Sequence, residues 1–344
     1  MKALVGVSGG VDSSVCALLL KNQGYEVIGA TMCLFENTNL DNAKKACDIL
    51  GIQHVILDYK KEFKKEIIDY FVDSYKNALT PNPCVMCNKK LKFGLMYDYA
   101  KENNIDYIAT GHYAKVEYSD EYKRYVLKKS NNLNKDQSYF LYGINKDILG
   151  KILFPLDKYE TKDEVRKIAL DNNLNTASLS DSEDICFIPD GNYKKFLEIN
   201  NYVKTSVGNV VLNDKIIGRH DGLYKYTIGQ RKGLGIAYDE PLYVIGFNKN
   251  NNELIVGVET SLYKNSFKVK DYNLLLVDEI KEPMLVTVKT RYRSREVQAK
   301  IKEENGYINV EFLEPQKGVT PGQSAVFYLD DIVVGGGIID EDIS

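Results

Sequence analysis

The strongest constraint on the fold is the string GVSGGVDSS at residues 6–14. It follows a short apolar run at residues 3–7 and precedes a stretch in which Val11, Val15 and Leu18 share one helical face. The adjacent glycines allow the backbone to turn sharply between these two segments. A strand, a glycine-rich turn and a helix in this order begin a parallel α/β sheet, and we expect that architecture for the N-terminal part of the chain.

The alternation of strand-like and helix-like segments continues through the first 110 residues. After the first strand and helix, the segments with this pattern are 25–32, 40–50, 54–58, 61–76 and 107–110. Gly24 and Gly51 stand where the first two helices are expected to end, a position that favours glycine. Strands separated by helices predict an α/β fold with a doubly wound parallel sheet.

From residue 205 onwards, helical periodicity fades and short strands separated by Gly and Asn turns replace it. Residues 242–247 and 254–258 flank an Asn-rich turn and predict a hairpin. Further strands are predicted at 284–290, 296–301, 307–312 and 324–328. We expect three domains, namely 1–203 with the α/β sheet, 204–267 as a small mainly-β linking domain, and 268–344 as a C-terminal β-barrel, with a sandwich as the alternative.

Composition narrows the function classes. The chain has 344 residues, a formal net charge of −3 and six cysteines. A negative net charge argues against a general nucleic-acid coat protein, although it allows a local basic face. No apolar run approaches the roughly 18 residues of a membrane helix, and the N-terminus lacks the length and cleavage site of a signal peptide. Cysteines without a dense framework are typical of a reducing compartment, so we expect a cytoplasmic protein without membrane association.

The chemistry of the loop is that of a phosphate site. Backbone N–H groups at the start of a helix attract anions, and Ser8, Ser13 and Ser14 add hydroxyl donors. Asp12 does not favour a bare phosphate, so we expect it to hold Mg²⁺ or to orient the loop. The chain has neither the GxxxxGK[ST] of kinase-type loops nor the GxGxxG of dinucleotide folds. An ordinary tight turn between strand and helix is the alternative.

The string SGGVDSS in this position resembles the loop of the ATP pyrophosphatases, which split ATP into AMP and pyrophosphate. The resemblance implies ATP and Mg²⁺ as cofactors. It also implies that the first chemical step is adenylation of a carboxyl or carbonyl oxygen.

Two cysteines stand close together in the string TPNPCVMCNKKLKF. We expect an amphipathic helix to begin just after Cys84 and Cys87. A thiol at a helix N-terminus among Lys89, Lys90 and Lys92 should have a lowered pKa and be a better nucleophile.

Cys186 stands alone in the string SEDICFIP, which we expect to form a polar loop. Half of a zinc site is one interpretation of the CxxC pair, although a second pair is absent and the chain has only three histidines. A buried structural role suits Cys16, Cys33 and Cys47, which lie in apolar-patterned segments. The remaining interpretation is sulfur chemistry, in which thiols from separate loops meet over the nucleotide.

Four strings occur in one order along the chain: the glycine-rich loop, TPNPxxxCN, EDICFI, and GRHDGLYKYTIGQRKGLG at residues 218–235. Together they closely resemble the tRNA-specific 2-thiouridylases, the MnmA family, nearly end to end from Gly6 to Gly337. The alternatives are another adenylating enzyme with the same loop, such as an amide-forming ligase, and a non-catalytic tRNA-binding protein. Ligase activity would not account for the cysteine strings or for the C-terminal β half of the chain.

The resemblance implies that ATP adenylates the O2 oxygen of the wobble uridine (position 34) of tRNA, and that sulfur replaces this oxygen. It implies that Cys186 carries a persulfide, charged by a cysteine desulfurase or a sulfur-relay protein, and that Cys87 is the nucleophile that frees the sulfur. The two cysteines would end as a disulfide. The ATP-binding residues implied by the motifs are Gly6, Val7, Ser8, Gly9, Gly10, Val11, Asp12, Ser13, Met32 and Gly111.

The same resemblance implies tRNA substrates of the Glu, Gln and Lys type. The implied contacts to the tRNA or its target base are Asn82, Pro83, Cys84, His112, Lys135, Asp136, Gln137, Arg291, Tyr292 and Gln323. Residues 289–300 contain five basic side chains around Tyr292 and predict a basic strand that contacts RNA. A solvated strand face is the alternative for any single residue.

The chain departs from the family pattern at Cys84, where many members have aspartate. This departure puts the aspartate's role near the target base in doubt. It also adds a third thiol to those of Cys87 and Cys186. Three thiols would suit a [4Fe–4S] cluster with one open iron position. We therefore predict that these three cysteines can ligate such a cluster.

Overall fold

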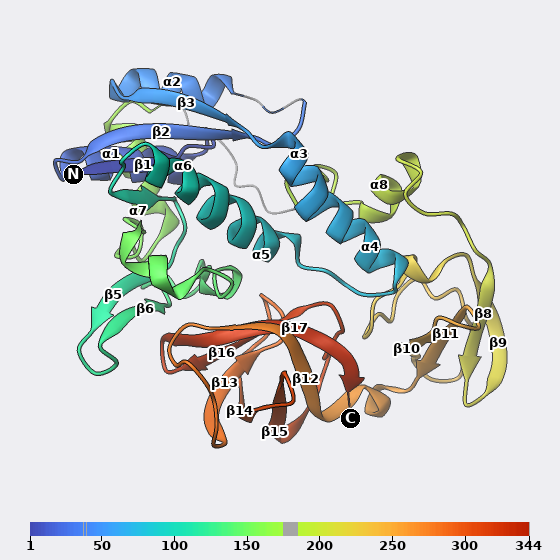
Figure 1. Ribbon diagram of the computed structural model, residues 1–344. Helices are drawn as coiled ribbons and strands as arrows, with labels where there is room; N and C mark the ends of the chain where they lie inside the picture. Colours follow the sequence, from blue (N-terminus) through green and yellow to red (C-terminus); the bar gives the residue numbers. More distant parts are fainter. Residues whose placement is uncertain (37, 39, 175–184, 344) are drawn as a thin grey trace.

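The computed structural model describes residues 1–36, 38, 40–174 and 185–343. An α/β part occupies the N-terminal half, a small β part stands to one side, and a barrel lies beneath the α/β part (Figure 1). Within the described residues, none of the helices has the length and apolar character needed to cross a membrane.

The predicted parallel sheet is confirmed. Its strands are β1 (Lys2–Gly6), β2 (Glu26–Cys33), β3 (Gln53–Asp58), β4 (Tyr107–Ala109) and β7 (Ile152–Leu153), in the order β3-β2-β1-β4-β7. All four neighbouring pairs run parallel. The first two helices are α1 (Val11–Asn22) and α2 (Asp41–Leu50). Gly24 and Gly51 follow them with φ of 86° and 59°, as the helix-stop prediction requires.

The central strand β1 sends alternate side chains into two cores. Ala3 and Val5 pack with residues of α1, whereas Leu4 packs on the opposite face with Met96. Because successive side chains of a strand point to opposite faces, both faces of the sheet must be covered by helices. The sheet is therefore doubly wound, as expected.

Two long helical runs lie side by side next to the sheet (Figure 1). The first comprises α3 (Lys60–Phe63), the π-helical segment η1 (Lys64–Asp69) and α4 (Tyr70–Lys76), and the second comprises α5 (Pro83–Cys87), the π-helical segment η2 (Asn88–Leu95) and α6 (Met96–Glu102). The second run begins at Pro83 and not after Cys87, which corrects the sequence prediction. Proline suits the first turn of a helix because a backbone N–H there has no intrahelical partner, so its absence costs no hydrogen bond. Cys84 and Cys87 thus lie within the first helix turns.

Other elements of this half were not predicted from the sequence. They are the 3₁₀ segments η3 (Ser138–Phe140) and η4 (Lys146–Lys151) and the helices α7 (Lys162–Asp171) and α8 (Tyr193–Ile199). Helix α7 packs against α1 through Val165 and Ala169.

The middle part is a four-stranded sheet in the order β10-β11-β8-β9. Its strands are β8 (Gly208–Leu212), β9 (Lys215–His220), β10 (Tyr243–Asn248) and β11 (Glu253–Gly257). The predicted hairpin is confirmed, because β10 and β11 pair antiparallel around the Asn-rich turn. Val210, Val244 and Leu254 form the centre of its small core.

The C-terminal part is a closed six-stranded barrel, as predicted. Its strands are β12 (Tyr263–Leu274), β13 (Met284–Lys289), β14 (Val297–Glu304), β15 (Tyr307–Lys317), β16 (Ser324–Leu329) and β17 (Ile332–Ile343), and pairing of β12 with β17 closes the ring. The basic strand predicted at 289–300 is wrong as a single element. It comprises the end of β13, a turn, and the start of β14.

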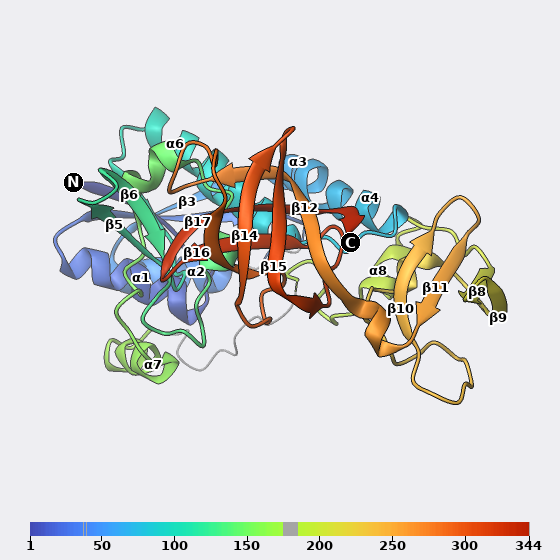
Figure 2. The same cartoon turned by 90° about the horizontal axis from the view of Figure 1, so that it is seen from below.

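A hairpin from the α/β part extends the barrel sheet. Strands β5 (Lys115–Ser119) and β6 (Arg124–Lys128) leave the α/β part, and β6 pairs with β17 at Lys128 and Ile332. Figure 2 shows this hairpin beside the barrel strands. Because it joins two parts of the fold, the domain limits 1–203, 204–267 and 268–344 stay a prediction.

Candidate active site

The glycine-rich loop lies between β1 and α1, at the edge where the parallel strands end. Gly9 has a φ of 81°, and a Cβ atom there would lie 2.8 Å from the backbone nitrogen of Ala43, so only glycine fits. The hydroxyls of Ser13 and Ser14 donate to the carbonyl of Gly10 at 3.0 and 2.9 Å. These bonds hold the loop in shape, with the first turn of α1 directed toward the position of an anion.

Asp12 stands in that first turn and is held by two partners from distant segments. The Tyr113 hydroxyl donates to its Oδ1 at 3.0 Å, and the Lys162 ammonium donates to its Oδ2 at 2.5 Å. Of the two roles expected for Asp12, these bonds serve the orientation of the loop. Lys162, the first residue of α7, was missed by sequence reasoning, because no motif connects it to the loop.

Gly111 brings the segment after β4 against the start of α1. A Cβ atom on Gly111 would lie 2.7 Å from the carbonyl carbon of Asp12 and 2.8 Å from the nitrogen of Ser13. Met32, near the end of β2, packs beside the apolar cluster that contains Cys87. The predicted ATP-binding residues and the thiols therefore lie along the same edge of the sheet.

The structure brings the segments of Cys87 and Cys186, the two thiols predicted to react, near each other. Cys87 lies in an apolar cluster with Phe63, Ile67 and Leu91, and Phe187, the neighbour of Cys186, packs against that cluster. The ring of Phe187 also contacts the rings of Phe63 and Phe71, at centroid distances of 5.6 and 5.3 Å. The segment around Cys186 is thus anchored by apolar packing, which corrects the prediction of a polar loop. Glu183 and Asp184 of the predicted EDICFI string lie outside the described residues.

The expected lowering of the thiol pKa values is wrong for this arrangement. Burial raises the pKa of Cys87, and loss of water around the sulfur raises the pKa of Cys84 although part of that residue is exposed. The positive charge of Lys92 offsets only part of both effects. Loss of water around its sulfur also raises the pKa of Cys186 to about 12, with further contributions from Cys87 and Cys84, although part of this residue is exposed. The physical reason is that the apolar surroundings disfavour a thiolate more strongly than the following lysines favour it. All three thiols are therefore protonated at neutral pH.

The three thiols are neighbours without forming a ready metal site. Among the described residues, no group of three or more His, Cys, Asp or Glu side chains is placed to hold a metal ion. Cys84 is exposed, whereas the side chain of Cys87 is buried. The predicted three-cysteine ligand set for an iron–sulfur cluster is therefore not preformed among the described residues, and it stays a prediction.

Two predicted tRNA-contacting stretches lie against each other. The backbone N–H of Tyr113 donates to Oε1 of Gln137 at 3.0 Å, and the N–H of Gln137 donates to the Tyr113 carbonyl at 2.8 Å. Asp136 accepts from the hydroxyl of Ser138 at 2.6 Å and is buried, and burial raises the pKa of its carboxyl. Asp136 therefore shapes its own loop, between the half-exposed Lys135 and Gln137.

His112 is buried beside this loop. Its Nδ1 lies 2.7 Å from the Thr110 hydroxyl, and its ring lies 5.9 Å from that of Phe93. Burial lowers its pKa well below the ordinary value, and Lys92 adds to the effect. The imidazole is therefore neutral at neutral pH.

The predicted tRNA contacts of the barrel hold the parts of the molecule together. Nε2 of Gln323 donates to the carbonyls of Thr80 and Pro81 at 2.9 and 3.3 Å, in the segment that leads to Asn82, Pro83 and Cys84. A second link between the parts starts at Arg291 of the barrel.

The guanidinium of Arg291 donates to the carbonyl of Ile228 in the middle part at 3.0 Å and to the hydroxyl of Thr320 in the barrel. Tyr292 packs on Phe140, with the ring centroids 4.4 Å apart. These residues join all three parts of the fold around the start of α5.

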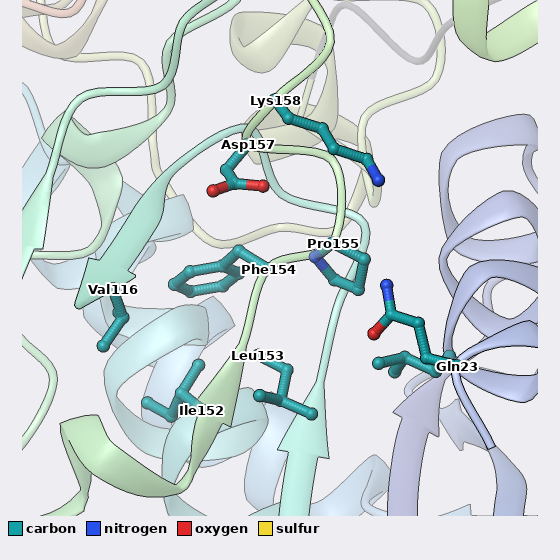
Figure 3. A pocket seen from close by; sticks show the side chains of 9 residues that line it. Gln23, Val116, Ile152, Leu153, Phe154, Pro155, Asp157 and Lys158 are labelled. Carbon is teal, nitrogen blue, oxygen red and sulfur yellow. The ribbon is translucent and has the colours of Figure 1, made fainter. Parts of the chain in front are cut away.

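A surface pocket of about 220 Å³ lies away from this site. Figure 3 shows its lining, with Phe154 and Asp157 on one side and Gln23 on the other. Gln23 follows the C-terminal end of the 12-residue helix α1, whereas the glycine-rich loop precedes its N-terminal end. At about 1.5 Å per residue, the two are separated by about 18 Å, so the pocket is not part of the site.

Comparison with known proteins covers nearly the whole chain. Residues 1–190 match the family described as the tRNA methyl transferase HUP domain, residues 194–258 the tRNA methyl transferase PRC-barrel domain, and residues 264–339 the aminomethyltransferase beta-barrel domain. The chain is 44% identical to a tRNA-specific 2-thiouridylase MnmA of Caldicellulosiruptor saccharolyticus, over 99% of this chain and 98% of that protein. It is 45% identical to the protein of the same name from Acetivibrio thermocellus, over 98% of this chain and 99% of that protein.

Among solved structures, an NMN synthetase from Francisella tularensis covers 60% of this chain and 79% of its own, at 16% identity and a TM-score of 0.35. This similarity is too weak to bear on function.

Proposed function

The chain belongs to the family of tRNA-specific 2-thiouridylases, and from that premise we propose which of its residues carry the reaction. The enzyme is a sulfurtransferase that uses ATP to replace the O2 oxygen of the wobble uridine of tRNA by sulfur. The observation that best supports our assignment is the packing of Phe187 against the cluster of Cys87, at the same edge of the sheet as the glycine-rich loop. This packing supports a reaction in which two thiols from distant segments act beside the nucleotide.

In the first step, the uridine O2 attacks the α-phosphorus of ATP, and the bond from this phosphorus to pyrophosphate breaks. The oxygen becomes part of AMP, which leaves more readily than a bare carbonyl oxygen would. We assign ATP binding to Gly6 through Ser13, Met32 and Gly111, with the phosphates on the first turn of α1. Mg²⁺ would be held by the phosphates of ATP and would supply positive charge to offset that of the departing pyrophosphate.

In the second step, the terminal sulfur of a Cys186 persulfide attacks C2 of the adenylated uridine, and AMP departs with the electrons of the C2–O bond. The Cys87 thiolate then attacks Sγ of Cys186. The persulfide S–S bond breaks, the sulfur stays on the uridine, and a Cys87–Cys186 disulfide forms. A thiol reductant must reduce this disulfide before the next turnover.

Cys87 needs help to act as a nucleophile, because its buried thiol is protonated at neutral pH. Lys92 is a half-buried lysine on the same helical run, and it forms no ion pair with any other described residue. Its positive charge favours the thiolate forms of Cys84, Cys87 and Cys186. We assign Lys92 the role of stabilising the thiolate of Cys87.

We further propose that the tRNA contacts the segments that meet around the start of α5. The assigned residues are Asn82, Pro83, Cys84, His112, Lys135, Asp136, Gln137, Arg291, Tyr292 and Gln323. Support comes from Arg293 and Arg295, which are exposed beside Tyr292 and can reach phosphates. The sulfur donor would be a cysteine desulfurase or a relay protein, the substrates tRNAs of the Glu, Gln and Lys type, and the compartment the cytoplasm.

The [4Fe–4S] cluster on Cys84, Cys87 and Cys186 stays a prediction, and no step above depends on it. Iron and sulfide analysis after anaerobic purification tests it. If Cys84→Ser loses less than half of any bound iron, the three-ligand assignment is wrong.

The proposal as a whole is tested by incubating the protein with ATP, Mg²⁺, a cysteine desulfurase with cysteine, and unmodified tRNA, followed by nucleoside analysis. We expect 2-thiouridine from the wild type and none from Cys87→Ser or Cys186→Ser. Cys47→Ala, which changes a buried thiol within α2, serves as the matched control and should remain active. A ligase would consume ATP with a small substrate and leave the tRNA unmodified, and a binding protein would release no pyrophosphate.

A further inference from the structure

The glycine-rich loop has no cation of its own. No lysine or arginine stands between Lys2 and Lys21, so the segment that receives the phosphates contains only Asp12 as a charged group. The triphosphate of ATP carries several negative charges, and the partial charge of one helix N-terminus offsets about half of one. Any positive charge beyond that of Mg²⁺ therefore has to come from a side chain elsewhere in the fold.

Lys162 is placed beside the loop by the capped N-terminus of α7. Thr161 caps α7, its hydroxyl accepting from the backbone N–H of Glu164 at 3.3 Å while the Glu164 carboxylate accepts from the backbone N–H of Thr161 at 3.1 Å. Val165 and Ala169 then fix α7 against α1. The ammonium of Lys162 reaches the carboxylate of Asp12, which stands in the first turn of α1.

The position is electrostatically unfavourable for a lysine with a purely structural role. A cation at a helix N-terminus opposes the helix dipole. The side chain is also only 10% exposed, so its charge loses most of its hydration. Asp12 compensates for both effects while the loop is empty, and Tyr113 holds Asp12 in place from the other side.

We propose that Lys162 is the phosphate-binding cation of this enzyme. In the ATP-free protein it pairs with Asp12, and when ATP binds with Mg²⁺ its ammonium turns to the β- and γ-phosphates, which leaves Asp12 available to the Mg²⁺. When the bond between the α-phosphorus and the bridging oxygen breaks, the electron pair goes to pyrophosphate, and Lys162 stabilises the charge that develops there. This inference rests on the ATP-splitting step of the proposed function.

The test is equilibrium binding of ATP, pyrophosphate and AMP, each with Mg²⁺, to purified full-length protein. We expect Lys162→Met to bind ATP and pyrophosphate on the order of tenfold to a hundredfold more weakly than the wild type, with AMP affinity little changed. Lys162→Arg, which keeps the charge, should recover part of the loss. Lys158→Met removes an exposed lysine four residues earlier and should bind all three ligands like the wild type.

The competing explanation is that Lys162 only fastens Asp12. A double-mutant cycle separates direct phosphate binding from this indirect role. If Lys162 acts only by holding the Asp12 carboxylate, Lys162→Met should have no effect on pyrophosphate affinity once Asp12 is Asn. We expect Lys162→Met to weaken pyrophosphate binding in the Asp12→Asn background as well, with circular dichroism and thermal unfolding confirming that each variant is folded. Unchanged pyrophosphate affinity in that background overturns the proposal. If the wild type itself bound no ATP, the proposed function would fail instead.

Discussion

At the residue scale, the surroundings of Cys87 set its reactivity. Phe63, Ile67 and Leu91 pack around its thiol, and the nearest favourable charge is that of Lys92. Burial therefore competes with the lysine, and burial has the larger effect. A raised thiol pKa also protects the enzyme from unwanted oxidation, because the thiolate is the reactive form.

The reactivity of Cys87 should follow its raised pKa. Because the thiolate fraction grows about tenfold per pH unit below the pKa, alkylation at Cys87 should rise steadily from pH 7 to pH 9 without a plateau. Iodoacetamide labelling with peptide mass spectrometry measures this rate. Lys92→Met should raise the pKa further and slow labelling at each pH. A plateau below pH 8 in the wild type contradicts the prediction.

Gly111→Ala should disrupt the nucleotide site. The added methyl group would lie under 3 Å from the backbone of Asp12 and Ser13, and neither backbone can yield without moving α1. We expect ATP affinity to fall by about tenfold or more, measured by calorimetry. Gly246→Ala is the control, since its nearest neighbour would be 3.9 Å away. Equal ATP affinities in the two variants would show that the close approach is unimportant.

At the element scale, the barrel holds the segment that leads into α5, the helix that contains Cys87. The backbone N–H of Thr80 donates to the carbonyl of Pro321 at 3.0 Å, and Gln323 donates to the carbonyls of Thr80 and Pro81. Gly322 allows this approach, because a Cβ atom there would lie 2.9 Å from the Thr80 nitrogen. The position of α5, and with it Cys87, thus depends on a loop of another domain.

Gln323→Ala should loosen this attachment. Two hydrogen bonds are lost, so we expect a destabilisation of roughly 1–2 kcal/mol and faster hydrogen exchange over residues 79–87. Thiolation should fall while ATP binding remains unchanged, because the nucleotide loop lies elsewhere. Gln316→Ala, which removes one hydrogen bond to the carbonyl of Glu314 on an exposed strand, is the matched control. Unchanged exchange over 79–87 in Gln323→Ala would contradict the prediction.

At the scale of the whole molecule, a chain with a net charge of −3 must bind a polyanion. Binding therefore depends on local positive surfaces and not on overall attraction. The turn between β13 and β14 is such a surface, since Arg293 and Arg295 are exposed there and, within the described part of the chain, neither forms an ion pair. The hydrogen bonds of Arg291 and Gln323 connect the barrel, which carries this turn, to the middle part and to the segment that leads to Cys84 and Cys87.

Replacing both Arg293 and Arg295 with Gln should weaken tRNA binding and reduce its salt dependence. If each arginine contacts one phosphate, the slope of log affinity against log salt should become shallower by about 2. Filter binding at several salt concentrations measures the slope. Lys281→Gln with Lys302→Gln, two exposed lysines of the barrel outside residues 289–300, is the charge-matched control. An unchanged slope in the arginine variant would exclude this turn from the tRNA surface.

The sequence by itself determined the features that local patterns encode. The glycine-rich string, the order of strands and helices, the β10–β11 hairpin and four barrel strands follow from residue periodicity and turn chemistry over short windows. The sequence also identified Cys87 and Cys186 as the thiols of interest, although only through their motifs. It could not predict that apolar packing would anchor the segment around Cys186.

Only the tertiary structure decided which distant residues meet. Lys162 reaches Asp12 because α7 packs on α1. The β5–β6 hairpin joins the barrel because the first residues of β17, around Ile332, lie outside its pairing with β12, and Gln323 of the barrel holds Thr80 of the α/β part. The thiol pKa values are likewise decided by the tertiary structure, because the neighbours that exclude water from the sulfurs come from several segments. Periodicity records which face of an element is apolar, but it carries no information about which partner covers that face.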